Sequence, residues 1–157
     1  MPKLVPWLGI SATVLILDLL TKYWVTQILA PGQSVRVTSF FNLVLVFNSG
    51  AAFSLFADAA GWQRVFFTSI ALVAAVIIVH LLRRHAQQCV FSLALSMILG
   101  GALGNVWDRI TQGHVVDFLH FHYQGYYWPA FNAADSAISV GVLLLIWDSF
   151  RKPRARG

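Results

Sequence analysis

The sequence predicts an all-α integral membrane protein: four transmembrane helices with a small extracytoplasmic insertion that forms a β-strand cradle and a short surface helix. The chain has 157 residues, 58% of them hydrophobic and 11% charged, and its mean hydropathy is +0.70. This is not the composition of a soluble globular protein. Four apolar stretches, at approximately residues 4–29, 65–82, 89–110 and 133–150, have about the twenty residues that a helix needs to cross a bilayer. We expect one membrane-embedded domain over residues 1–157.

The first apolar stretch has some features of a secretory signal peptide, but it is too long to be one. Its apolar run continues through Asp18 and Lys22 to Leu29, beyond the usual length of a signal peptide's apolar core. We therefore expect an uncleaved membrane helix. Cys89 is the only cysteine, so an internal disulfide is excluded.

The distribution of positive charge predicts the orientation. Most cations lie at the amino terminus, between the second and third apolar stretches, and at the carboxyl terminus. An even number of spans places both termini on one side, and the excess of Lys and Arg marks that side as cytoplasmic. The net charge of +5 then indicates contact with anionic membrane lipid, and we expect no nucleic-acid partner.

The connection over approximately residues 33–62 predicts secondary structure at the outer membrane surface. Residues 35–38 alternate in polarity and residues 43–47 are β-branched or aromatic, which is typical of short strands. Asn48 and Gly50 predict a turn, and residues 51–56 predict a short amphipathic helix. Trp62 and Trp128 are expected to anchor the chain at headgroup depth.

With this orientation, most polar residues outside the termini gather near the outer leaflet. Asp117 and Asp135 are the candidate catalytic residues, since two neighbouring carboxylates can share a proton and activate water as in aspartic proteases. A structural alternative is open for each of them. Asn132 could cap the fourth helix while Asp135 complements its positive end. Asp117 could be a hydrogen-bonded loop carboxylate.

Three polar residues share one face of the third helix, namely Asn105, Asp108 and Arg109. They could form a structural knot in which Arg109 pairs with an aspartate and Asn105 bonds across helices. Arg109 and Asn105 could also hold a peptide carbonyl or position the catalytic carboxylates. Asp18 and Lys22 are four residues apart in the favoured order, which predicts a mainly structural ion pair.

Other hydrolase chemistries lack their residues. The chain contains no glutamate, which excludes the His-Glu-x-x-His zinc site, and it has no Gly-x-Ser-x-Gly motif. His114, His120 and His122 have no diagnostic metal-ligand spacing, and histidines at the membrane interface are the simpler interpretation. We therefore expect no metal and no cofactor.

Five sequence blocks, taken together, resemble the bacterial lipoprotein signal peptidase (type II signal peptidase) family. They are residues 18–22 (DLLTK), 47–54 (FNSGAAFS), 100–109 (GGALGNVWDR), 115–118 (VVDF) and 131–136 (FNAADS), in the order of the family. Leu19 stands where a glutamine is common in the family. The resemblance implies a four-helix aspartyl endopeptidase of the bacterial inner membrane, which cleaves diacylglyceryl-modified prolipoproteins just before the lipidated cysteine.

The resemblance also implies roles for individual residues. Asp117 and Asp135 fall on the catalytic pair of the family. A second set falls on supporting or substrate-contacting positions or within the same blocks: Asn48, Gly50, Asn105, Asp108, Arg109 and Asn132. We expect a monomer that contacts membrane lipid. The alternative is a small proton- or cation-coupled transporter or channel subunit that uses Asp18, Asp117 and Asp135, with carboxylates distributed through the bilayer.

Overall fold

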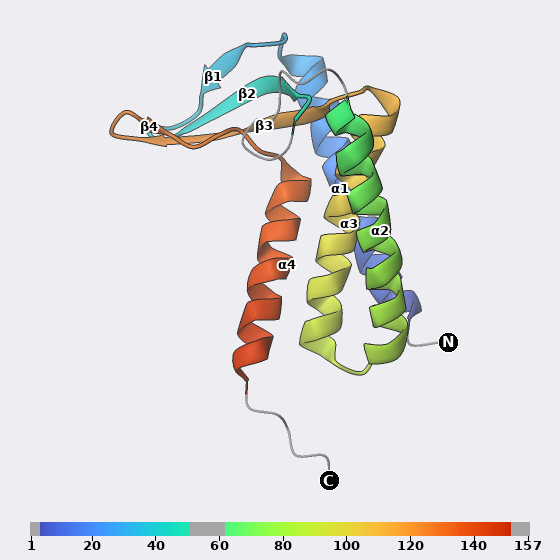
Figure 1. The fold of residues 1–157 in the computed structure, drawn as a ribbon. Helices are drawn as coiled ribbons and strands as arrows, with labels where there is room; N and C mark the ends of the chain where they lie inside the picture. Colours follow the sequence, from blue (N-terminus) through green and yellow to red (C-terminus); the bar gives the residue numbers. More distant parts are fainter. Residues whose placement is uncertain (1–3, 51–61, 152–157) are drawn as a thin grey trace.

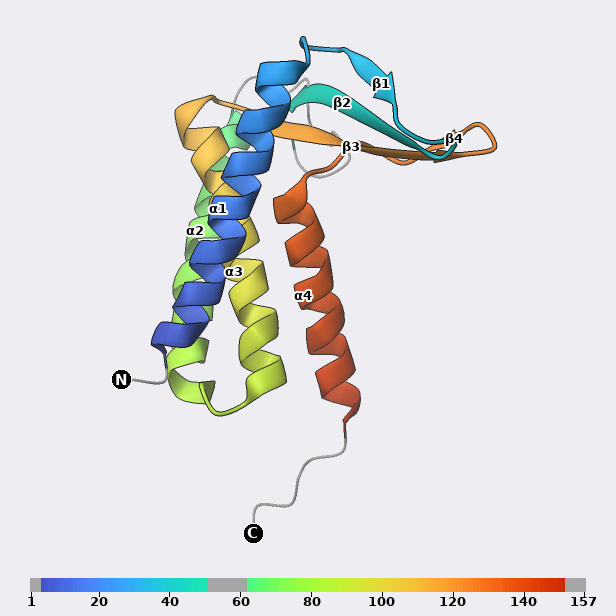
Figure 2. The ribbon, with the colours of Figure 1, turned by 180° about the vertical axis from the view of Figure 1, so that it is seen from behind.

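The computed structural model describes residues 4–50 and 62–151. Four helices in this part are long and apolar enough to cross a membrane: α1 (Val5–Ile28), α2 (Trp62–His85), α3 (Cys89–Thr111) and α4 (Ala133–Phe150). The helices form a bundle, and a sheet extends sideways from one end of it (Figure 1). We call this the sheet end. The chain enters α1, and α2 turns into α3, at the opposite end (Figure 2).

Helix α3 is the centre of the bundle and packs against all three other helices. Two glycines allow the close approach. A Cβ atom on Gly100 would lie 2.5 Å from the carbonyl oxygen of Ser11 in α1, and one on Gly101 would lie 2.5 Å from that of Ala134 in α4. The faces turned away from α3 carry exposed apolar side chains such as Val73 and Leu143. Such faces are suited to contact with lipid.

The sheet has four antiparallel strands in the order β1 (Ser34–Arg36), β2 (Phe41–Asn48), β3 (Val115–Tyr123) and β4 (Tyr126–Tyr127). β2 and β3 form its main pair, and their register shifts between Leu43 and Val46. Beyond the shift, Val46 lies opposite Asp117 and Asn48 lies opposite Val115. Asn48 and Asp117 are therefore diagonal neighbours on one face.

A small apolar core fixes the sheet to the helices. It contains Val25 and Leu29 from the end of α1, Leu45 from β2, and Val116 and Phe118 from β3. Because side chains alternate along a strand, the burial of Val116 and Phe118 directs Asp117 to the other face. Packing of this core therefore sets the direction of the Asp117 side chain.

The predicted fold class is confirmed: four long apolar helices and a small antiparallel sheet. The second helix is longer than expected, since it continues through polar residues at both ends to cover Trp62–His85. The cradle is also larger, because β3 and β4 from the last connection complete it. The predicted surface helix at residues 51–56 lies outside the described residues. Trp62 and Trp128 are both exposed.

Candidate active site

Asp117 is the third residue of β3 and is almost completely buried, with 2% of its surface exposed. Both carboxylate oxygens accept hydrogen bonds from side-chain amides. Asn132 Nδ2 donates to Oδ1 at 2.8 Å, and Asn48 Nδ2 donates to Oδ2 at 2.9 Å. In the described part of the chain, no cation forms an ion pair with Asp117. A buried carboxylate held only by neutral donors is costly to ionise.

Asp135 occupies the first turn of α4, where it forms a capping box with Asn132. The Asn132 side chain accepts from Asp135 N at 2.9 Å, and Asp135 Oδ2 accepts from Asn132 N at 3.2 Å. These bonds satisfy backbone donors that the helix start leaves unpaired. Asn105 Nδ2 of α3 donates to Asp135 Oδ1 at 2.8 Å. Asp135 is less buried than Asp117.

Asn132 connects the two carboxylates and is itself fully buried. Its position depends on Phe131, whose backbone N–H donates to Leu119 O at 3.0 Å and whose carbonyl accepts from Leu119 N at 2.8 Å. These two bonds place the start of α4 beside β3. The Asn132 side chain then reaches Asp117 with its amide nitrogen and Asp135 N with its oxygen. A strand and a helix start thus share one polar residue.

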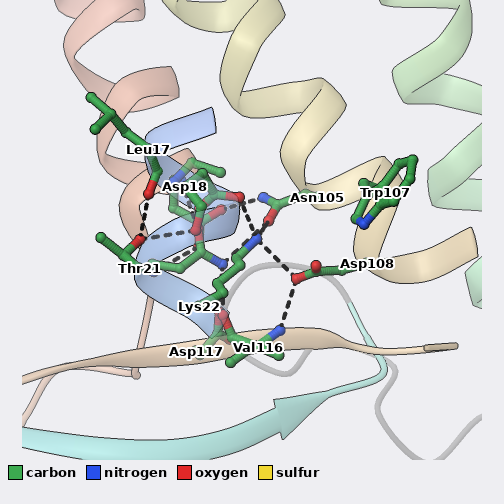
Figure 3. A network of polar contacts seen from close by, with 12 residues as sticks. Leu17, Asp18, Thr21, Lys22, Asn105, Trp107, Asp108, Val116 and Asp117 are labelled. Atoms are coloured by element: carbon green, nitrogen blue, oxygen red, sulfur yellow. Dashed lines mark hydrogen bonds and ion pairs between the residues drawn. The ribbon is translucent and has the colours of Figure 1, made fainter. Parts of the chain in front are cut away.

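Lys22 joins two other aspartates, Asp18 of α1 and Asp108 of α3 (Figure 3). Its Nζ lies 2.7 Å from Asp18 Oδ2 and 2.9 Å from Asp108 Oδ2, and it donates to Asn105 Oδ1 at 3.0 Å. All three donors of the ammonium group are used. Lys22, Asp18 and Asp108 are each at most 3% exposed. We call these three residues the Lys22 triad.

The Lys22 triad holds the backbone next to each candidate carboxylate. Asp108 Oδ2 accepts from Val116 N at 3.1 Å, one residue before Asp117. Asp18 Oδ1 accepts from Ala134 N at 2.8 Å, one residue before Asp135, at the positive end of α4. The triad therefore couples α1 and α3 to the two segments that carry the pair. The sequence predicted the Asp18–Lys22 contact but gave no sign of the bonds to Val116 and Ala134.

Arg109 approaches the site from α3. Its Nη2 donates to Gly50 O at 3.1 Å, its Nη1 donates to Asn105 O at 3.4 Å, and its guanidinium lies 5.7 Å from the centre of the Phe67 ring. The predicted ion pair between Arg109 and an aspartate does not form among the described residues, where Lys22 pairs with Asp108 instead. The buried Nε of Arg109 has no hydrogen-bond partner in the described part.

Burial is the main reason that the pKa of the Asp117 carboxyl is raised from 3.8 to about 7. The charge of Asp135 raises this pKa further, which requires the two carboxylates to be near neighbours. Hydrogen bonds from Asn48 and Asn132 act in the opposite direction. Near neutral pH, Asp117 therefore exists in both the protonated and the ionised form.

The three histidines singled out in the sequence each contact an aromatic ring. His114 lies 4.2 Å from Phe47 between ring centres, and His120 and His122 both stack on Tyr127 at 5.5 Å. Within residues 4–50 and 62–151, no group of three or more His, Cys, Asp or Glu side chains could hold a metal ion.

The structure brings together most of the predicted site. Asn48, Asn105 and Asn132 donate directly to the candidate pair, while Asp108 acts through the backbone of Val116. Gly50 is held from both sides, because its N–H donates to Asn48 Oδ1 at 3.0 Å and its carbonyl accepts from Arg109. Gly104 belongs to a small-xxx-small pattern that indicated close helix packing but no role at the site, yet a Cβ atom there would collide with Asp18 Oδ2. The glycine-rich run at residues 100–104 was the available signal.

Comparison with known proteins gives consistent matches over nearly the whole chain. A family model described as Signal peptidase (SPase) II matches residues 10–151. The Lipoprotein signal peptidase of Janthinobacterium sp. (strain Marseille) is 54% identical, covering 96% of this chain and 91% of that protein. The one from Paraburkholderia phytofirmans is 56% identical, covering 97% and 88%. A solved bacterial membrane enzyme structure is 32% identical with a TM-score of 0.82, covering 97% and 93%. The chain belongs to the signal peptidase II family.

Proposed function

We propose that this protein is a membrane aspartic endopeptidase that removes signal peptides from diacylglyceryl-modified prolipoproteins, cleaving just before the lipidated cysteine. Similar proteins carry the name Lipoprotein signal peptidase at 54–56% identity, which supports the substrate class. The observation that carries the proposed chemistry is a contrast among the four aspartates at the sheet end. Asp18 and Asp108 both pair with Lys22, whereas Asp117 and Asp135 are held by side-chain amides.

This contrast, together with burial, supports different roles for the two carboxyl groups: Asp117 is the general acid and Asp135 the general base. Burial raises the pKa of Asp117 to about 7, so a large fraction of the protein has Asp117 protonated at neutral pH, and this form donates the proton to the carbonyl oxygen of the scissile bond. Asp135 is less buried, lies at the positive end of α4, and takes a proton from the attacking water. After water attack, the proton on Asp135 passes to the leaving amine and Asp117 recovers its own.

We assign Arg109 to positioning the substrate backbone and Asn48 to positioning the Asp117 carboxylate. The unpartnered Nε of Arg109 is a buried donor beside the pair, and a backbone carbonyl of an extended substrate would satisfy it. Asn48 fixes one oxygen of Asp117, which directs the other side of the carboxyl group toward Asn132. Asn105 does the same for Asp135 from α3.

The proposed topology places both termini in the cytoplasm and the pair at the outer leaflet. Arg83 and Arg84 lie at the end of α2 that is opposite the sheet, which supports a cytoplasmic location for that end. The transporter alternative is not favoured. It requires carboxylates distributed through the bilayer, but Asp18, Asp108, Asp117 and Asp135 gather at the sheet end.

Purified protein in detergent, incubated with a diacylglyceryl-modified prolipoprotein, tests this function directly. Asp117→Asn and Asp135→Asn should each reduce cleavage at least a thousandfold, since neither variant can complete the proton transfers, while both insert and fold. Asp148→Asn, at the other end of α4, is the matched control and should retain full activity. Wild-type cleavage of the unmodified precursor at the same rate would refute the substrate assignment. Normal turnover by either of the first two variants would refute the chemistry.

A further inference from the structure

A groove with a volume of about 630 Å³ runs along the bundle on the side away from the Asp117–Asp135 pair. Helices α1 and α2 form its walls and α3 its floor. Among the described residues, both walls pack on α3 but make hardly any contact with each other. The lining on α2 runs from Leu72 to Arg83, about 16 Å along the helix. This length corresponds to roughly one leaflet of the ~30 Å hydrocarbon core.

The interior of the groove is apolar. Leu8 and Leu15 contribute from α1, and Leu99 and Leu103 contribute from α3. Ala12, on α1, also lines the groove, and its small side chain leaves space between the walls open. Ser11 is the one polar side chain on the α1 wall, and its hydroxyl donates within the helix to Trp7 O at 3.2 Å. The α1 wall therefore offers an apolar surface, and its one hydroxyl group already has a hydrogen-bond acceptor.

Two basic side chains form the end of the groove farthest from the sheet. His80 and Arg83 are one turn apart on α2, both line the groove, and both are exposed. Within residues 4–50 and 62–151, Arg83 forms no ion pair with a carboxylate. Arg84, the next residue, is also exposed but does not line the groove. The groove thus has one apolar part and one cationic end.

We propose that this groove binds an anionic phospholipid, with one acyl chain between α1 and α2 and the phosphate at Arg83 and His80. Charge complementarity identifies the occupant, because a phosphodiester supplies the anion that Arg83 lacks and its acyl chain supplies the apolar surface. The proposed topology names the cytoplasmic leaflet as the source of this lipid. The lipid of a substrate is a different molecule, since it must reach Asp117 at the sheet end.

Native mass spectrometry of the full-length protein in detergent tests this site with defined lipids. Phosphatidylglycerol and phosphatidylcholine with identical acyl chains are added separately. We expect phosphatidylglycerol to remain bound at a higher fraction. Arg83→Gln should weaken its apparent affinity by about fivefold, the effect of ~1 kcal/mol for one arginine at an anionic lipid surface. Arg84→Gln is the matched control and should leave the affinity within a factor of two.

A second pair of variants tests the apolar part. Ala12→Phe fills the groove and should reduce binding of phosphatidylglycerol, whereas Thr13→Phe adds the same ring on a lipid-facing position outside the groove and should not. Equal binding of both lipids by wild type would overturn the proposal. So would equal losses in Arg83→Gln and Arg84→Gln, which would indicate diffuse attraction to a basic surface. Unchanged binding in Ala12→Phe would exclude the groove.

Discussion

The Asn132 side chain donates to Asp117 Oδ1 at 2.8 Å, so the residue that caps α4 also fixes a carboxylate in the sheet. Asn132→Ala should therefore have two separable effects. Loss of the cap should lower the free energy of unfolding by about 1 kcal/mol. Loss of the side-chain amide should reduce cleavage at least a hundredfold, since the Asp117 carboxylate loses a positioning contact and the backbone N–H of Asp135 loses its acceptor. Thermal unfolding and turnover measure the two effects.

Asn42→Ala is the control for this prediction. Asn42 lies in the same sheet, and its side-chain oxygen contacts His122 Nε2 at 3.3 Å, away from the candidate pair. This variant should retain activity within a few-fold. Equal activity of the two variants would contradict the role of Asn132.

The raised pKa of Asp117 predicts how stability depends on pH. Between pH 3.8 and about 7 the folded state holds more protons at Asp117 than the unfolded state does. Stability therefore falls as pH rises through this window, by up to about 4 kcal/mol, and levels off above it. Asp117→Asn should remove this part of the slope when the melting temperature is measured from pH 5 to 8. Parallel slopes for the two proteins would contradict the raised pKa of Asp117.

Cleavage by the wild type should decline above about pH 7, as Asp117 loses its proton.

Lys22→Met should destabilise the protein strongly, because it leaves Asp18 and Asp108 buried without their cation. Breaking a buried ion pair in this way costs about 3–5 kcal/mol. Replacing both aspartates by asparagine in the same variant should restore part of the lost melting temperature. Arg36→Met removes an exposed cation and should have little effect. A melting temperature in Lys22→Met equal to that of the wild type would mean that the triad does not stabilise the fold.

Gly104 and Gly9 form a matched pair of helix glycines. In Gly104→Ala the new methyl group would collide with Asp18 Oδ2, so α1 and α3 must separate or the Lys22 triad must shift. Overpacking of this kind costs about 1–3 kcal/mol, and activity should fall with it. In Gly9→Ala nothing lies within 4 Å of the new atom, and helix propensity should raise stability by up to ~1 kcal/mol. Unfolding in detergent compares the two, and a tolerated Gly104→Ala would show that the close approach is not required.

Cysteine labelling tests the orientation. Cys89 is exposed at the start of α3, at the end opposite the sheet. In right-side-out vesicles a membrane-impermeant maleimide should label it only after permeabilisation. Tyr126→Cys in a Cys89→Ser background places a thiol at an exposed position on β4 and should be labelled at once. The reverse pattern would invert the proposed topology.

Sequence patterns predicted those parts of the fold that depend on local composition. The four apolar runs identified the helices, although α2 extends past its apolar core into Arg83 and His85 because hydrogen bonding continues after hydropathy falls. The pairing of β2 with β3, in contrast, depends on contacts between distant parts of the chain. Val46 and Asp117 are far apart in sequence, and no local signal reports which strand lies opposite which.

For the candidate site, too, the sequence predicted the residues but not the contacts between them. Residue types and their spacing identified Asp117 and Asp135 as candidates, but the partners of charged groups depend on packing. Arg109 was a plausible partner for an aspartate, yet the ammonium group of Lys22 reaches Asp108. Bonds from side chains to the backbone, such as that between Asp18 and Ala134 N, leave no trace in a sequence pattern.

The division of the site between β3 and α4 limits when the protein can act. Each helix can enter the bilayer before the others pack against it. At that stage Asp135 is a capping residue on an isolated helix and Asp117 belongs to an unpaired segment. The two carboxylates become neighbours only once β3 has paired with β2 and Phe131 has bonded to Leu119. Under the proposed mechanism, a newly inserted chain cannot cleave the proteins around it until its assembly is complete.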